Sequence, residues 1–288
     1  MSVVDVRDVT ISYGRNIAVD KVTFKVEQGS VYALLGRNGA GKSSLVRCIV
    51  GQQKPAGGSV ALFERDAWKH RTPLMERTGV VAEDADAPPE MTAGQIERFC
   101  SRVYARWDSA AVYERLKRFG IDPKSKFGTL SKGQRKQVSL AMALASSPEL
   151  VILDDPTLGL DVVARRSLFE EVVGELADRG LTVLVTTHDL AGVETIADRI
   201  GILSEGRLVL DEDLEALKSR FRRVRMTGPA SIEAAKVRAW GGGTEAIVTN
   251  YDAFLQERLH GTNVVEVTAM SLEEIFIAVG GEEKGTAS

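Results

Sequence analysis

The fold of this chain is decided by the stretch VYALLGRNGAGKSS, residues 31–44. The apolar run 31–35 is typical of a buried strand, and the amphipathic stretch that begins at Ser44 is typical of a helix. A strand that turns sharply into a helix directs successive backbone N–H groups, and the positive end of the helix dipole, into one concavity. The glycine-rich octapeptide 36–43 is therefore predicted to bind phosphate, with a glycine turn that merely precedes a lysine as the alternative.

The octapeptide supplies most of the predicted nucleotide contacts. Its glycines permit positive φ angles and a close approach of the ligand, which side chains would block. Lys42 is predicted to reach the β and γ phosphates and to take part in catalysis, and the Ser43 hydroxyl is predicted to ligate Mg²⁺. The predicted nucleotide-binding residues of this segment are Gly36, Arg37, Asn38, Gly39, Ala40, Gly41, Lys42, Ser43 and Ser44.

Composition narrows the class of protein. The chain has 288 residues, of which 44% are hydrophobic, which suits a large α/β domain with an appendage, or two domains. No apolar run approaches the ~20 residues that span a bilayer, and no secretory signal is visible, so the cytoplasm is the expected location. Cys48 and Cys100 match no metal spacing and are expected to be reduced thiols.

The charge balance argues against a nucleic-acid partner. A formal net charge of -3 offers no global field that would attract a phosphate backbone. A small local cluster is formed by Arg222, Arg223 and Arg225, which we interpret as a solvated strand face. No nucleic acid is therefore expected among the partners.

The segments around the phosphate loop predict an α/β fold. Before residue 63, β-rich and partly alternating segments predict an antiparallel β region. Further along, buried apolar strands alternate with helices, which indicates parallel pairing and, overall, a mixed sheet. The predicted strands are 3–12, 19–26, 31–35, 59–63, 150–153 and 181–187, followed by a hairpin at 200–210 and a short polar helix at 211–220.

Changes of period predict two further regions. Thr92 and Gln95 form a capping-box pair, which starts a helical subdomain over about 92–147. After residue 220, short strands alternate with short helices, which predicts a small α+β domain over 221–288. Its last residues, 280–288, are polar and expected to fray. The sequence thus predicts a nucleotide-binding domain over 1–220 with an α+β extension.

Two carboxylates are predicted to lie beside the phosphate loop. Asp154 and Asp155 directly follow an apolar strand, and ligands bind at that edge of a parallel sheet. Asp154 is in a position to hold Mg²⁺ or its water shell, and Asp155 would face the attacking water as a catalytic residue. The alternative is that these two acidic residues only cap the turn that follows the strand.

The segment LSKGQ, residues 130–134, predicts a helix N-terminus. Ser131 is a natural N-cap, and Gln134 completes a capping box, so this peptide is able to clasp an anion. The same capping residues are equally typical of an ordinary helix start that binds no ligand.

Together these segments resemble the nucleotide-binding subunit of an ABC transporter, over roughly residues 3–220. Residues 130–134 resemble that family's signature peptide, which is nearly diagnostic, whereas many NTPases share the phosphate loop. The resemblance implies a P-loop NTPase core that uses ATP and Mg²⁺. It also implies a head-to-tail dimer, in which the signature residues of one chain approach the γ phosphate held by Lys42 of the other. These residues are Ser131, Gly133 and Gln134.

The resemblance assigns further site residues. Tyr13 resembles the aromatic residue that stacks on adenine, and His188 resembles the catalytic switch histidine at a strand end. Asp161 closes a segment, 158–161, that resembles the loop after the second carboxylate. Tyr13 equally fits a strand-end aromatic residue, and His188 a hydrogen-bonded structural histidine. Residues 271–276 resemble the end of the C-terminal extension found in exporter-type systems.

Two positions depart from the family's pattern. Asp155 stands where a glutamate is usual, and its side chain is shorter by one methylene of ~1.5 Å. A displacement of about 1 Å can cost about a hundredfold in rate, so slow turnover is expected. Glu83 stands where a glutamine usually reaches Mg²⁺ and the membrane partner. We predict Glu83 as a metal ligand, with a solvated acidic loop as the alternative.

The leading functional hypothesis is the ATPase of a membrane exporter that works with a separate transmembrane permease, from the cytoplasmic face of the membrane. The surface from Glu83 through the helical subdomain would grip that permease, with Phe99 and Trp107 as candidate contacts or, alternatively, core residues. A cytosolic non-transport ABC ATPase is a second hypothesis, but a single phosphate loop without sustained heptads tells against it. A slow nucleotide-gated clamp is the third. Whether the dimer is a homodimer or contains a paired ATPase subunit stays open.

Overall fold

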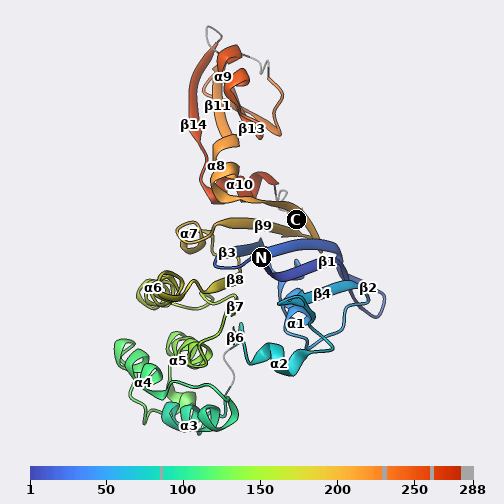
Figure 1. The fold of residues 1–288 in the computed structure, drawn as a ribbon. Helices are drawn as coiled ribbons and strands as arrows, with labels where there is room; N and C mark the ends of the chain where they lie inside the picture. The colour runs from blue at the N-terminus through green and yellow to red at the C-terminus, as the bar shows by residue number, and fades with distance from the viewer. Residues whose placement is uncertain (85–86, 229–231, 260–262, 280–288) are drawn as a thin grey trace.

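The computed structural model describes residues 1–84, 87–228, 232–259 and 263–279 (Figure 1). The residues in these ranges form three sheets, one of six strands and two of four. Within the described ranges, the helices are too short or too polar to cross a membrane. The predicted α/β class is confirmed, and the predicted end segment 280–288 lies outside the described residues.

The central sheet carries the phosphate loop. All of its pairs are parallel except the pair of β10 with β9. The inner strand β3 is buried on both faces, because Tyr32 and Leu34 pack into one core and its alternate residues pack into another. In spatial order the strands are β10 (Arg207–Asp213), β9 (Arg199–Ser204), β3 (Val31–Gly36), β8 (Thr182–Thr187), β7 (Leu150–Asp154) and β6 (Thr78–Val81).

The second sheet is the predicted antiparallel β region. It packs together with helix α1 in one core on one side of the central sheet (Figure 1). Cys48 of α1 is buried there, and both Cys48 and Cys100 are free thiols, as predicted. The elements are β2 (Asn16–Glu27), β1 (Ser2–Tyr13), β4 (Gly57–Leu62), β5 (Arg65–Asp66), α1 (Lys42–Ile49) and, before β6, α2 (Arg71–Met75).

Helices cover the other face of the central sheet and form the helical subdomain. The predicted capping box of Thr92 and Gln95 is confirmed at the start of α3. Helix α4 is joined to α6 by a buried ion pair between Arg115 Nε and Glu171 Oε1, at 2.8 Å. The elements here are α3 (Ala93–Val103), α4 (Ser109–Arg118), a 3₁₀ turn (Phe127–Thr129), α5 (Lys132–Ala145), α6 (Val162–Arg179) and α7 (Leu190–Val193).

The prediction of a polar helix over 211–220 is wrong in its first part. Strand β10 continues to Asp213, and only Leu214–Arg220 is helical, as α8. The reason is that Asp211 has partners at the sheet edge, where it accepts from Arg199 Nε at 2.7 Å and from the Tyr32 hydroxyl at 3.2 Å. Strands β5, β6 and β12 and helix α2 were not predicted.

The C-terminal region forms a third, antiparallel sheet with one apolar face. That face buries Val224, Met226, Ala246 and Val248, among others. The predicted division of the chain at residue 220 stays a prediction, although this sheet begins just after it. Its elements are β12 (Lys236–Trp240), β13 (Gly243–Val248), β11 (Arg222–Thr227), β14 (Val264–Ala269), α9 (Ala253–Leu259) and α10 (Leu272–Val279).

The interpretation of the arginine cluster as a solvated face is wrong. Arg225 Nε lies 2.9 Å from an oxygen of the buried Glu245, and Arg238 Nε donates to the same carboxylate at 2.7 Å. Arg223 is paired with Glu274. Arg222, Arg223 and Arg225 are therefore half-buried, and Arg225 and Arg238 each lie opposite Glu245 on a neighbouring strand, where opposite charges attract.

Candidate functional site

The loop between β3 and α1 has a backbone that only glycine tolerates at two positions. Gly41 has a φ of 106°, and a Cβ atom there would lie 2.6 Å from the carbonyl oxygen of Ala18. Gly36 has an ordinary φ, but a Cβ atom there would lie 2.7 Å from the carbonyl oxygen of Leu203. Helix α1 begins at Lys42 rather than at Ser44, and within the described chain no side chain caps it. Its first N–H groups are therefore open to an anion, as a phosphate site requires.

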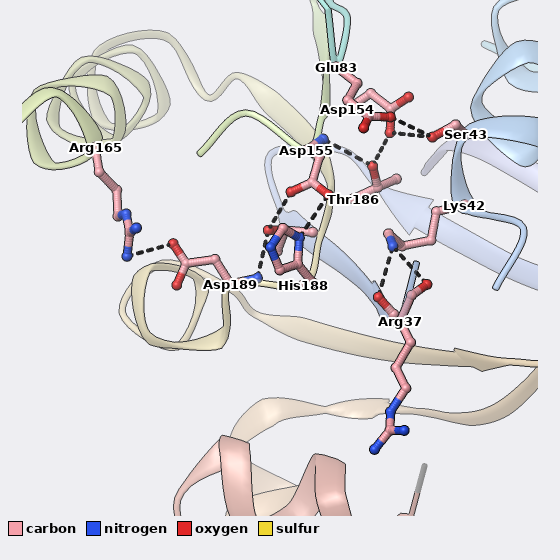
Figure 2. A network of polar contacts seen from close by, with 12 residues as sticks. Arg37, Lys42, Ser43, Glu83, Asp154, Asp155, Arg165, Thr186, His188 and Asp189 are labelled. Atoms are coloured by element: carbon pink, nitrogen blue, oxygen red, sulfur yellow. Dashed lines mark hydrogen bonds and ion pairs between the residues drawn. The ribbon is translucent and has the colours of Figure 1, made fainter. Parts of the chain in front are cut away.

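Lys42 is buried beneath this loop. Its Nζ donates to the carbonyl of Gly36 at 2.8 Å and to that of Arg37 at 3.3 Å (Figure 2). Burial lowers the pKa of Lys42, and the nearby carboxylates of Asp155 and Asp154 oppose that shift. Because carbonyls are neutral partners, a phosphate oxygen would be a stronger, charge-assisted acceptor for the same ammonium group.

The predicted metal ligands lie together in the structure. The Ser43 hydroxyl lies 3.4 Å from Asp154 Oδ1 and 3.5 Å from Glu83 Oε2, on the side of the loop away from Arg37 (Figure 2). One hydroxyl and two carboxylates suit Mg²⁺, which binds few protein ligands and completes its shell with phosphate oxygens and water. In the described ranges, no group of three or more acidic, histidine or cysteine side chains is built to hold an ion alone.

Asp155 and His188 form a second polar group beside the first. Asp155 Oδ2 lies 2.9 Å from His188 Nδ1, and Asp155 Oδ1 accepts from the Thr187 hydroxyl at 3.3 Å. Asp155 is 4% exposed, whereas the His188 side chain is 42% exposed and lies at the surface of the site. A buried carboxylate that orients a more exposed imidazole is a common arrangement for proton transfer.

The remaining predicted residues lie outside this cluster. Ser131 and Gln134 form the predicted capping box at the start of α5, and Gly133 packs against Leu160. Asp161 caps α6 by accepting from the N–H of Ala164 at 2.8 Å. Among the described contacts, none joins these residues to the phosphate loop of the same chain. Their predicted contact with nucleotide therefore stays a prediction that requires a second chain.

Tyr13 lies at the end of β1, next to the phosphate loop. Its hydroxyl lies 3.2 Å from the Ser44 hydroxyl and 2.8 Å from Gln53 Oε1. The hydrogen bond with Ser44 is the main cause that lowers the pKa of Tyr13. The residue is 45% exposed, and its predicted stacking on adenine stays a prediction.

The sequence did not indicate two charged residues, Lys136 and Arg165, whose side chains contact residues of the site. Lys136 of α5 is buried with its Nζ between the carbonyls of Ala82 and Asp155. Arg165 of α6 pairs with Asp189, the residue after His188, with 3.0 Å between Nη1 and Oδ2 (Figure 2). From the sequence alone, a lysine one turn after the start of a helix is expected to be solvated. No local pattern indicates that this side chain points into the core.

Comparisons with known proteins point to one family. A family model described as "ABC transporter" matches residues 19–158. A bacitracin transport ATP-binding protein of Bacillus licheniformis is 30% identical over 77% of this chain and 73% of its own length. A fluoroquinolones export ATP-binding protein of Mycobacterium tuberculosis is 30% identical over 98% of this chain and 94% of its own length. A dimeric ATP-binding cassette, solved with ADP and Pi in a post-hydrolysis state, has 26% identity and a TM-score of 0.66. That match covers 73% of this chain and 98% of the solved chain.

Proposed function

The chain belongs to the ABC transporter family as an ATP-binding, ATP-hydrolysing subunit, and from this premise we propose that it powers a separate membrane permease. Its relatives include a fluoroquinolones export protein and Nod factor export proteins, which favours export as the direction of transport. A cytosolic ATPase without a transport role is correspondingly disfavoured. The proposed location is the cytoplasmic face of the membrane.

The proposed catalytic roles rest on one observation. Polar and charged side chains at the ends of three neighbouring strands lie close together. Lys42 and Ser43 follow β3, Asp155 follows β7, and His188 follows β8. Ser43, Asp154 and Glu83 would hold Mg²⁺, which would neutralise phosphate charge in the bound nucleotide. We propose that Lys42 binds the phosphates and that Asp155 orients the attacking water. The imidazole of His188 would then lie near the γ phosphate.

A dimer would complete the nucleotide site. Ser131 is exposed at the start of α5, and the exposed Val162 and Val163 follow the Asp161 loop. A similar structure is described as a dimeric ATP-binding cassette, which supports a dimer for this chain as well. We propose that ATP held by Lys42 of one copy contacts the helix N-terminus at Ser131 of the other. Binding of ATP would then favour association by mass action.

The proposed permease surface is an apolar groove in the helical subdomain. A cavity of about 420 Å³ lies between α3, α5 and the strand β6, which ends just before Glu83. Trp107 lines it and donates to Glu97 Oε1 at 3.1 Å, so this residue has a structural role as well. Phe99 and Val103 lie on α3, a helix that contributes other residues to the cavity lining, and they are 62% and 64% exposed. Exposed apolar residues next to an apolar groove favour a protein partner.

Replacing Phe99 by serine is expected to weaken binding of the permease without affecting the ATPase. Burial of a phenylalanine is worth about 1.5–3 kcal/mol, which corresponds to roughly a 10- to 100-fold loss of affinity. The measurement is recovery of the integral membrane protein that co-purifies with the tagged chain. Val209→Ser, at a side chain that is 48% exposed on the distant β10, is the matched control. Equal recovery with both variants would remove Phe99 from the interface.

The turnover of Asp155→Glu tests whether the short side chain of Asp155 limits the rate of ATP hydrolysis. We expect turnover to rise by about tenfold or more, because the longer side chain brings its carboxylate closer to a water at the γ phosphate. Glutamate tolerates the positive φ of Asp155 less well, so stability should fall by about 1 kcal/mol. Steady-state hydrolysis and thermal unfolding measure the two effects separately. A variant no faster than the parent would refute the argument from side-chain length.

The proposal as a whole is tested by isolating the tagged chain from its native membranes. We expect a polytopic membrane protein to accompany it and ATP to be hydrolysed by the complex. Recovery with ribosomes or DNA, and without any integral membrane protein, would contradict the proposal.

A further inference from the structure

Lys136 is a buried cation with no part in the mechanism above. It lies near the start of α5, is 3% exposed, and donates from Nζ to the Ala82 carbonyl at 3.1 Å and to the Asp155 carbonyl at 3.0 Å. Burial lowers the pKa of Lys136, and the surrounding carboxylates, Asp155 foremost, oppose that shift. A buried ammonium group costs free energy unless it has partners, so this side chain needs both carbonyls and the nearby acids.

The backbone of Asp155 explains what the contact can do. Asp155 has a φ of 43°, in the left-handed region that residues with side chains rarely adopt, although aspartate adopts it more readily than most. Such conformations persist only where the surroundings impose them. Here the N–H of Asp155 donates to the Thr186 carbonyl at 2.8 Å, and the carbonyl of Asp155 accepts from Lys136.

The direction of the Asp155 carboxylate depends on that backbone. From the left-handed position its two oxygens meet the Thr187 hydroxyl and His188 Nδ1. A return to the ordinary helical or extended region would rotate the Cα–Cβ bond and move the carboxylate away from both partners. The short side chain has few torsions with which to compensate.

We propose that Lys136 is a positioning residue that holds the left-handed backbone of Asp155 and thereby aims its carboxylate. The inference rests on the proposed catalytic role of Asp155. Through Ala82, the residue before Glu83, Lys136 also ties the end of β6 to the same helix. Since Ser131 caps that helix, Lys136 connects the helix that would meet the second copy to the backbone of Asp155 in its own chain.

The first test is Lys136→Met, which keeps most of the apolar stem and removes the donors. We expect kcat for ATP hydrolysis to fall by about 10- to 100-fold, the loss typical of a misplaced catalytic group, with the Kd for ATP within about twofold of the parent. The control is Lys117→Met, which removes an exposed lysine from α4 and should leave both values unchanged. A parental kcat for Lys136→Met would overturn the proposal.

The second test combines Lys136→Met with Asp155→Asn. If Lys136 acts through the Asp155 carboxylate, its loss should lower the residual turnover of Asp155→Asn by less than about twofold. A further 10- to 100-fold loss in the double variant would mean a general structural role and would overturn the proposal. Full turnover of Asp155→Asn alone would instead overturn the catalytic role of Asp155.

A replacement variant covers the case in which Lys136→Met folds poorly. Lys136→Gln keeps an amide donor for one carbonyl and is judged by the same double-variant criterion. Its kcat is expected to lie between those of the parent and Lys136→Met.

Discussion

Lys42→Met is expected to remove almost all ATP hydrolysis by this chain. The lysine is buried under the phosphate loop, and the charge-assisted hydrogen bonds proposed between it and phosphate would be worth about 1.5–3 kcal/mol each. Their loss should weaken ATP binding by roughly 10- to 100-fold. Loss of one preorganised cation at the transferring phosphate should lower kcat by a further ~10²–10³. Equilibrium binding of ATP and steady-state hydrolysis measure the two losses.

The control for this prediction is Lys54→Met. Lys54 is exposed in the connection between α1 and β4, so its replacement removes one positive charge outside the loop. The melting temperature of Lys42→Met must also be compared, because the carbonyls of Gly36 and Arg37 lose their partner. Turnover within threefold of the parent at saturating ATP would show that Lys42 has no catalytic part.

Asp155→Asn is expected to reduce hydrolysis to a small residual rate and to accumulate an ATP-bound dimer. Asparagine has nearly the same shape and its amide oxygen can still accept from the Thr187 hydroxyl, but it carries no charge and is a poor proton acceptor. Loss of a general base lowers rates by typically ~10²–10⁴-fold. The dimer should be visible by light scattering with ATP and Mg²⁺, because cleavage no longer releases it.

Asp178→Asn is the matched control for Asp155→Asn. Asp178 is exposed on α6, so the same chemical change there should leave turnover and association unchanged. A variant Asp155→Asn that stays monomeric at saturating ATP would contradict the proposed closure of two copies around nucleotide. Hydrolysis at the parental rate would contradict the role of Asp155 independently of the dimer.

The parts of the site that could be predicted from the sequence are those whose residues lie close together along the chain. The loop at 36–43 and the capping boxes at Thr92 and Ser131 depend on residues within one turn of each other, so spacing alone indicates them. The order of strand, loop and helix around the loop also follows from local hydrophobic patterns. The resemblance to a family then supplied Tyr13, Glu83 and His188, which no local pattern indicates.

The parts that could not be predicted depend on contacts between distant segments. The partners of Lys136 come from the ends of β6 and β7, and β6 itself is only four residues long. Asp155 has a positive φ and backbone contacts with Thr186 and Lys136, and no glycine at this position signals that conformation. The extension of β10 through Asp211 likewise depends on Arg199 and Tyr32, so an acidic stretch that reads as helix becomes strand.

The anchoring of Tyr13 affects how the site would discriminate among nucleotides. Its hydroxyl is held by the protein itself, through Ser44, Gln53 and Arg47, so a base stacked on this ring would meet a flat face and no directional group. Stacking of this kind accepts any purine, because every base has a π-face. A preference for adenine over guanine would have to come from elsewhere, and the cellular abundance of each triphosphate would largely decide which fuel is consumed.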